Sequence, residues 1–305
     1  MNKQELLKLY NMDLDELLKL SSKYMSNNVE FCSLVNARSG KCSQNCKYCA
    51  QSSHYSTDVE DYPLIKKEEV VKAALEAKEN GVIRFAVVTS GKSPDEENFD
   101  KILEFVDELN KLEGIRSCAS IGILTEEQAK KLAEHGLKRV HHNINTSESY
   151  YGEICTTHSW QDRLNTCKYV KKYGMELCCG VILGMGESIE QRIEMALELR
   201  EIEPESIPIN ILMPIPKTPF ENYHDKIDEE NVLRTLAVFK IACPNSSIRL
   251  AGGKKARLSQ ETIEKAFKYC IDSTIVGNYL TTTGFTPEDD AKMIKDLGRE
   301  LLVSK

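Results

Sequence analysis

Three cysteines lie within eight consecutive residues near the start of the chain, at Cys42, Cys46 and Cys49. Their C-x3-C-x2-C spacing matches neither an ordinary zinc site nor a disulfide pair. Closely spaced thiolates hold iron-sulfur clusters, and a four-iron cluster normally takes four cysteines. A loop with three cysteines therefore predicts a 4Fe-4S cluster with one open iron. Such an iron can chelate the amino and carboxylate groups of S-adenosylmethionine and pass it an electron, and the cleavage that follows gives a 5′-deoxyadenosyl radical.

A zinc site or a disulfide framework explains these cysteines less well. Zinc would require a second C-x2-C or a pair of histidines at a suitable distance, and His54 is the only nearby candidate. Disulfide dependence is typical of small secreted domains, whereas this chain is long and begins with a polar run rather than a signal peptide. The 11 cysteines therefore indicate a metal-handling protein in a reducing cytoplasm.

Length and composition fit one sizeable enzyme. A chain of 305 residues with 41% hydrophobic content can bury a large core, and its length alone allows one or two domains. No Pro/Gly/Ser-rich tract marks a linker, and no apolar run is long enough to cross a membrane. The net charge of −7 is spread along the chain, which argues against a nucleic-acid partner.

Short apolar strands alternate with amphipathic helical patterns along the chain. One helical pattern opens at Thr125, whose spacing to Gln128 suits a capping box, and ends at Gly136, which suits a C-cap. Two helices, Lys3 to Tyr10 and Asp13 to Ser26, come before the first strand. We expect eight strands, beginning near Phe31, Val82, Arg116, Arg139, Glu176, Ser206, Ile248 and Thr274.

This alternation predicts an α/β protein of the (βα)8 TIM-type barrel class with N-terminal helices. We expect residues 1–30 to form a helical extension and residues 31–305 to form the barrel. The active site of such a barrel lies at the carboxyl ends of the strands. The cysteine loop follows the first strand, so it lies where a barrel enzyme would hold a cofactor.

Six stretches, the first of which contains the cysteine loop, follow one another in a fixed order and spacing. With them, the chain resembles the biotin synthase family of radical S-adenosylmethionine enzymes from about Leu34 to Thr286. The resemblance implies conversion of dethiobiotin to biotin, in which two C–H bonds are replaced by C–S bonds and a second, auxiliary iron-sulfur cluster supplies the sulfur. The stretches are Cys42 to Tyr55, His142 to Ser147, Gly184 to Glu187, Pro208 to Leu212, Ile248 to Gly252 and Leu280 to Thr282.

The resemblance also implies which residues bind the cofactor. Cys42, Cys46 and Cys49 would hold the 4Fe-4S cluster. Arg163 would meet the methionyl carboxylate, for which a guanidinium fork is well shaped. The other positions implied to contact S-adenosylmethionine are Tyr48 at the adenine edge, Asn143 and Asn145 after the fourth strand, and Ile182, Gly184, Gly186 and Glu187 along the nucleoside pocket. The family usually has Asp where this chain has Asn145, so a charged ribose contact is neutral here.

Dethiobiotin has a neutral ureido ring at one end and a carboxylate tail at the other. Amide side chains suit the ring, and the resemblance points to Asn143 and Asn210. Hydroxyl groups suit the carboxylate tail, and the resemblance points to Thr281 and Thr282. A run of threonines after a strand is also explained by β-propensity alone.

The auxiliary cluster is where the chain departs from the family pattern of three cysteines, on strands two, three and five, and an arginine on strand seven. Cys118, Cys178 and Arg249 match that pattern, but Ala86 stands where the strand-two cysteine belongs. A changed ligand set implies either the familiar 2Fe-2S cluster or an atypical four-iron cluster with an extra sulfide. We expect Cys32, on the neighbouring first strand, to supply the missing thiolate.

The other cysteines are weaker replacements. Cys243 precedes the seventh strand and is the second choice. Since side chains alternate along a strand, Cys179 should face away from the side that Cys178 faces. Cys167 and Cys270 lie in helical patterns and are expected to be buried hydrophobic residues.

Two other classes of protein stay open from the sequence. Loss of the strand-two cysteine would suit a radical S-adenosylmethionine enzyme that catalyses a rearrangement or cofactor maturation without inserting sulfur. The other class is a non-catalytic iron-sulfur electron carrier or metal-binding module, but carriers are small and need neither an open iron nor a large barrel. As partners, the resemblance implies a flavodoxin or ferredoxin as electron donor and a second copy of the chain in a homodimer.

Overall fold

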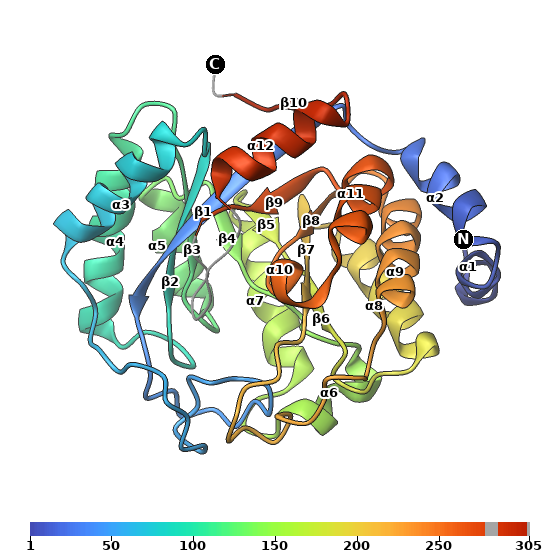
Figure 1. Cartoon of the computed structure of the whole chain (residues 1–305). Helices are drawn as coiled ribbons and strands as arrows, with labels where there is room; N and C mark the ends of the chain where they lie inside the picture. Colours follow the sequence, from blue (N-terminus) through green and yellow to red (C-terminus); the bar gives the residue numbers. More distant parts are fainter. Residues whose placement is uncertain (278–285, 304–305) are drawn as a thin grey trace.

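The computed structural model describes residues 1–277 and 286–303. Within them, parallel strands form a closed barrel, because each strand pairs with the next and β9 pairs back onto β1 (Figure 1). The predicted (βα)8 barrel is confirmed. The strands are β1 (Asn28–Arg38), β2 (Arg84–Thr89), β3 (Arg116–Ser120), β4 (Arg139–His141), β5 (Glu176–Cys178), β6 (Val181–Leu183), β7 (Ser206–Ile211), β8 (Ser247–Leu250), β9 (Ser273–Ile275) and β10 (Glu300–Leu301).

The fifth barrel strand is interrupted. Both β5 and β6 pair in parallel with β7, through Cys178 with Ser206 and Val181 with Ile209, so together they fill one place in the barrel. A side chain at Gly180, in the gap between them, would put its Cβ 1.9 Å from the backbone oxygen of Pro208. Glycine therefore lets the interrupted strand lie close to β7.

Helices surround the barrel and begin where the sequence supplies caps. The Thr125 hydroxyl accepts a hydrogen bond from the backbone N–H of Gln128, and the backbone N–H of Thr125 donates to the Gln128 side chain, as the capping box predicted. The helices are α1 (Lys3–Tyr10), α2 (Leu14–Ser22), α3 (Lys67–Glu79), α4 (Glu96–Asn110), α5 (Glu126–Glu134), α6 (Glu148–Ile154), α7 (Trp160–Lys172), α8 (Ile189–Ile202), α9 (Glu229–Ala242), α10 (Lys254–Arg257), α11 (Gln260–Tyr269) and α12 (Pro287–Asp296).

The two N-terminal helices pack on the outside of the barrel, against α8 and α9 (Figure 1). The hydroxyl of Tyr10 donates to Asn231 at 2.7 Å and accepts from Arg192 at 3.1 Å, and the Tyr10 side chain is buried. α2 ends at Ser22, four residues earlier than expected, because the next residues turn toward β1 and the backbone N–H of Ser26 donates to Asp272.

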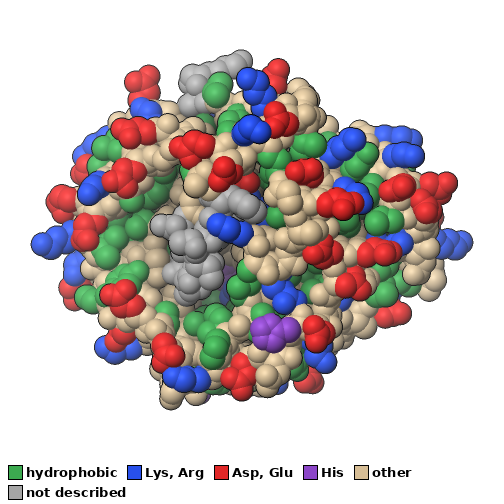
Figure 2. Space-filling view, viewed as in Figure 1, with side chains coloured by type: hydrophobic (Ala, Val, Ile, Leu, Met, Phe, Trp, Pro, Cys, Tyr) green, Lys and Arg blue, Asp and Glu red, His purple; other side chains and the backbone are tan. Residues whose placement is uncertain are grey.

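The short strand β10 pairs with the first residues of β1, at the end of the barrel opposite the cysteine loop (Figure 1). No helix in the described part of the chain is long and apolar enough to cross a membrane. Acidic and basic side chains are interspersed on the face shown in Figure 2, as expected from a net charge spread along the sequence.

Candidate active site

The cysteine loop lies at the carboxyl end of β1, on the rim where a barrel holds its active site. The backbone N–H of Cys42 donates to Gln51 at 2.9 Å, and Ser53 donates back to Cys42 at 2.8 Å. Cys42, Cys46 and Cys49 are only partly buried, whereas the chain's other cysteines are buried. Three accessible thiols held by a folded loop fit a 4Fe-4S cluster with one open iron.

A fourth cysteine lies against this loop. The sulfur of Cys155, at the end of α6, is 3.7 Å from that of Cys46 and 3.3 Å from Nδ1 of His158. In the cluster-free chain, Cys46 donates the hydrogen bond between the two sulfurs, which raises the pKa of Cys46 and lowers that of Cys155. Sequence reasoning missed this contact, because more than a hundred residues separate the two cysteines and no local pattern connects them.

Three residues that the resemblance assigns to S-adenosylmethionine, Tyr48, Asn145 and Arg163, meet beside the loop. The Tyr48 hydroxyl lies 2.9 Å from the Asn145 side-chain amide. With its oxygen facing Arg163, that amide accepts from Nε at 3.2 Å and from Nη2 at 3.1 Å. Arg163 also donates to the backbone oxygen of Asn143 at 2.5 Å. Its described partners are all neutral oxygens, so its charge is available to a carboxylate.

The turn after β6 is built from two glycines and a glutamate. Gly184 and Gly186 have φ values of 90° and 100°, which favour glycine. The carboxylate of Glu187 accepts from the N–H groups of Gly184 and Met185 at 2.9 and 2.8 Å and pairs with Arg192 at 2.9 Å. Glu187 therefore holds the turn in shape, and its carboxylate faces the turn's own backbone.

Asn143 and Asn210 flank the interrupted fifth strand. Asn143 accepts from the N–H of Gly180 at 3.0 Å. Asn210 donates to Val181 at 3.2 Å and accepts from Gly252 at 3.0 Å. Both side chains are thus held at the carboxyl end of the barrel. Thr281 and Thr282, expected at the substrate tail, lie outside the described residues.

The proposed auxiliary ligands face the inside of the barrel. Nη1 of Arg249 lies 3.5 Å from the sulfur of Cys178, and Nη2 pairs with Glu30 of β1 at 2.9 Å, across the barrel. Cys118 and Cys32 interact electrostatically with Arg249 and with each other. Burial raises the pKa of Cys118 to about 11 and that of Cys32 further. The four groups therefore face one buried space.

Ala86 does line this inner face, but it supplies no ligand. Ala86 pairs with Leu34 of β1 and with Cys118 of β3. Cys32 lies two residues before Leu34 on β1, so the two side chains face the same side of the strand. His141 of β4 also interacts with the charges around this space, and its buried Nε2 has no hydrogen-bond partner in the described part of the chain. Burial lowers the pKa of His141, so its imidazole ring is neutral and can offer a nitrogen lone pair to a metal. Sequence reasoning missed it.

The remaining cysteines lie away from this interior. Cys179 faces outward, as predicted, and its sulfur lies 3.8 Å from that of Cys167 on α7. The thiol of Cys243 contacts the backbone oxygen of Ala196 on α8, so Cys243 is not positioned to replace the missing ligand. Cys270 is part of the hydrophobic core, as expected.

A charged network underlies the ligands. Glu30 pairs with Arg84 at 2.7 Å and Arg139 at 3.1 Å as well as with Arg249. Glu176 pairs with Arg84 and Arg139 at 2.8 and 2.6 Å. Burial alone would raise the pKa of Glu30, but the three guanidinium groups outweigh it and lower the pKa to about 2.

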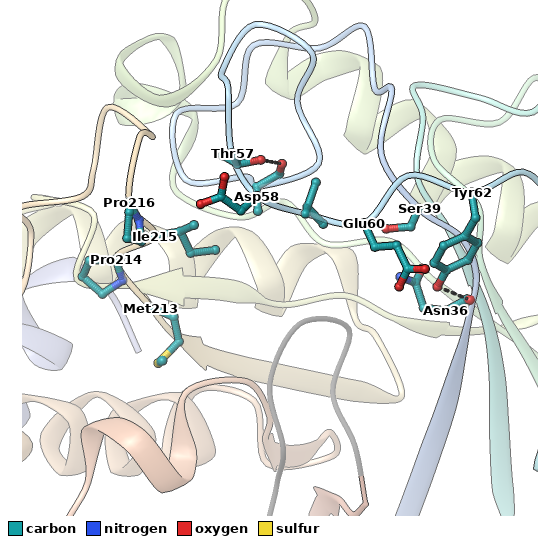
Figure 3. Close-up of a pocket in the computed structure, with 12 residues that line it drawn as sticks. Asn36, Ser39, Thr57, Asp58, Glu60, Tyr62, Met213, Pro214, Ile215 and Pro216 are labelled. Atoms are coloured by element: carbon teal, nitrogen blue, oxygen red, sulfur yellow. Dashed lines mark hydrogen bonds between the residues drawn. The ribbon is translucent and has the colours of Figure 1, made fainter.

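A cavity of about 510 Å³ opens beside the cysteine loop (Figure 3). Figure 3 shows Asn36 and Tyr62 on one side and Met213 to Pro216 on the other. Tyr62 donates to the backbone oxygen of Asn36 at 2.9 Å, whereas the side-chain oxygen of Asn36 is buried without a partner in the described chain. Asn36 is a further polar residue that sequence reasoning missed, because alone it looks like any strand residue.

Comparison with known proteins gives this site a context. Residues 37–199 match the Radical SAM superfamily, and residues 208–300 match the Biotin and Thiamin Synthesis associated domain. A protein of Acetivibrio thermocellus named biotin synthase is 48% identical over 283 residues, which are 93% of this chain and 88% of that protein. One of Clostridioides difficile with the same name is 45% identical, over 95% of this chain and 89% of its own.

Solved structures share the fold at low sequence identity. Methylornithine synthase (PylB) superimposes with a TM-score of 0.84 and 16% identity, covering 99% of this chain and 94% of its own. The hydrogenase maturase HydG from Carboxydothermus hydrogenoformans gives the same TM-score and identity, covering 99% and 76%. The family match over residues 37–199, which include the cysteine loop, defines an enzyme of the radical S-adenosylmethionine type. Within that class, the chain belongs to the biotin synthase family.

Proposed function

We propose that the protein converts dethiobiotin to biotin by inserting sulfur with radical S-adenosylmethionine chemistry. The observation that carries this proposal is the joint placement of two thiol sets, one on the barrel rim and one deep inside, in a chain 48% identical to a biotin synthase. When bound, the 4Fe-4S cluster and S-adenosylmethionine supply the radical that removes hydrogen, and the auxiliary cluster supplies the sulfur.

The residues of the rim bind and orient the cofactor. Cys42, Cys46 and Cys49 hold the cluster. Arg163 directs its uncompensated charge at the methionyl carboxylate, a geometry in which two parallel hydrogen bonds are possible. Tyr48 and Asn145 contact the nucleoside, and the neutral amide leaves the charge of Arg163 for the carboxylate. Ile182 and the turn from Gly184 to Glu187 form the wall of the nucleoside pocket.

Substrate lies between the two clusters in this proposal. Asn143 and Asn210 bind the ureido ring, with Thr281 and Thr282 at the carboxylate tail. Asn36 adds an unpaired oxygen that can accept an N–H of the ring. Dethiobiotin then lies beside Asn210 on the path toward Cys178 and Arg249. A flavodoxin or ferredoxin supplies electrons, and the enzyme acts in the cytoplasm as a homodimer.

The rim assignment is tested by changing Cys42, Cys46 or Cys49 to Ala. Each change should abolish cleavage of S-adenosylmethionine, because two thiolates do not keep a four-iron cluster with an open iron intact. Iron and sulfide analysis should show that the auxiliary cluster remains. Formation of 5′-deoxyadenosine at the wild-type rate in any of the three variants would overturn the assignment.

The auxiliary site is proposed to use Cys32, Cys118 and Cys178 with Arg249, and the cluster is either 2Fe-2S or an atypical four-iron one. Cys32→Ala should lower the iron content and stop biotin formation, while 5′-deoxyadenosine still appears. Cys270→Ala is the matched control, since Cys270 is equally buried but lies in the hydrophobic core. If Cys32→Ala keeps its iron and makes biotin normally, Cys32 only packs, and the unpaired Nε2 of His141 becomes the next ligand to test.

A further inference from the structure

Cys155 is held against the cysteine loop by contacts that do not depend on a cluster. The backbone N–H of Lys47 donates to Ile154 at 2.9 Å, and the side-chain oxygen of Asn45 accepts from the N–H of Thr156 at 3.0 Å. These bonds tie both sides of Cys46 to the segment that carries Cys155. The Cys155 side chain is 3% exposed, so its thiol has little access to water.

His158 determines which way the hydrogen bonds run. Its Nδ1 lies 2.9 Å from the side-chain oxygen of Gln44, and its Nε2 lies 2.9 Å from the hydroxyl of Tyr151. An amide oxygen only accepts, so Nδ1 carries the hydrogen and Nε2 accepts from Tyr151. That same Nδ1–H faces the sulfur of Cys155 at 3.3 Å. The sulfur accepts from the imidazole and keeps its own S–H for another partner.

Two acceptors lie within reach of that S–H, Oδ1 of Asn45 at 3.5 Å and the sulfur of Cys46 at 3.7 Å. In the cluster-free chain, Cys46 still carries its own proton and donates to Cys155. A cysteine that ligates iron is a thiolate, which has lost its own proton and accepts hydrogen bonds more strongly than a thiol. We propose that Cys155 donates this S–H···S bond to Cys46 in the cluster-loaded enzyme, and that Cys155 with His158 thereby makes the radical cluster easier to reduce. Hydrogen bonds to cluster sulfurs are among the factors that set reduction potentials, because they draw negative charge away from the iron.

The inference rests on the proposed function, because it requires Cys46 to ligate the 4Fe-4S cluster. The same atoms have a second possible use. The ligand atoms of Cys46, Cys155 and His158 lie within 4.8 Å of one another, a spacing that a single tetrahedral metal ion also fits. Cys46 would then be a ligand of that ion together with Cys155. A hydrogen bond and a metal bond differ in their effect on iron content, so one experiment separates them.

The test is an anaerobic redox titration of the reconstituted full chain, followed by the EPR signal of the reduced radical cluster. Cys155→Ala should contain the same iron and sulfide as the wild type but show a more negative midpoint potential. Cys155→Ser should give a potential closer to that of the wild type, because its hydroxyl can still donate. Cys243→Ala is the matched control, because Cys243 is a buried thiol of the hydrophobic core that contacts the backbone oxygen of Ala196, and the midpoint potential of this variant should match that of the wild type.

An unchanged potential in Cys155→Ala with a full complement of iron would overturn the inference. So would loss of iron from the radical cluster in both Cys155 variants at wild-type thermal stability, which would make Cys155 a ligand instead. Failure of the proposed function gives a different result, since the wild-type chain itself would then show no reducible 4Fe-4S cluster that cleaves S-adenosylmethionine.

Discussion

Asn145 meets two requirements that few residues meet together. Its φ of 68° lies in the left-handed region, where Asn and Asp are several-fold enriched among residues other than glycine. Its side chain is buried and connects Tyr48 with Arg163. Asp would suit the backbone equally but would neutralise the guanidinium charge. The choice of Asn at this one position therefore leaves Arg163 free to bind an anionic group.

Asn210 lies at the same rim with half of its side-chain hydrogen-bonding capacity in use. The amide donates one hydrogen to the backbone oxygen of Val181 and accepts one hydrogen bond from the N–H of Gly252, so one hydrogen and one lone pair are left for substrate. Asn210→Ala should weaken dethiobiotin binding by about 1 to 3 kcal/mol, the usual cost of an unpaired buried polar group. The measurement is the apparent affinity at saturating S-adenosylmethionine, whose own affinity should barely change. Wild-type affinity for dethiobiotin would remove Asn210 from the pocket.

The elements follow local sequence patterns, and these were predictable. The first strand begins three residues before its expected position, and the second begins two residues after its own. The positions agree this closely because the alternation of apolar residues and the helix caps are local signals. The break in the fifth strand was not predictable. It depends on how closely Gly180 approaches Pro208 of β7, a contact between segments that only the folded barrel brings together.

The interruption of the fifth strand at Gly180 can be tested through its effect on stability. Gly180→Ala should lower the free energy of unfolding, since the new Cβ would lie 1.9 Å from the Pro208 oxygen and the strand would have to shift. Gly152→Ala is the control, because nothing lies within 4 Å of a Cβ at that position in α6. It should be neutral or stabilising by a few tenths of a kcal/mol to about 1 kcal/mol. Equal unfolding midpoints in urea for both variants would show that β7 has room to move.

On the scale of the whole barrel, the interior is polar at its amino end. Glu30 and Glu176 pair with Arg84 and Arg139 across the strands, beneath the proposed auxiliary site. Sequence reasoning identified Arg249 from a family match but gave no reason to connect it with Glu30, since closure of all the strands creates that contact. The candidate site was thus predictable where motifs carry it and not where residues from distant strands meet.

Glu30 makes this network sensitive to acid. Its pKa is about 2 in the folded chain and about 4.5 in an unfolded one, so its ionised form stabilises the fold above pH 4.5 by about 3 kcal/mol, and this stabilisation is lost as the pH falls toward 2. Glu30→Gln leaves the guanidinium groups without this partner and should cost about 3 to 5 kcal/mol at pH 7.

Urea unfolding of the iron-free chain measures both effects. The difference in unfolding free energy between wild type and Glu30→Gln should be largest at pH 7 and should shrink at pH 3, because the wild-type carboxylate gains protons on unfolding there. Glu97→Gln is the control, since the exposed pair of Glu97 with Lys101 on α4 contributes well under 1 kcal/mol. A difference that stays constant between pH 7 and pH 3 would mean that the arginines lose packing rather than a charged partner.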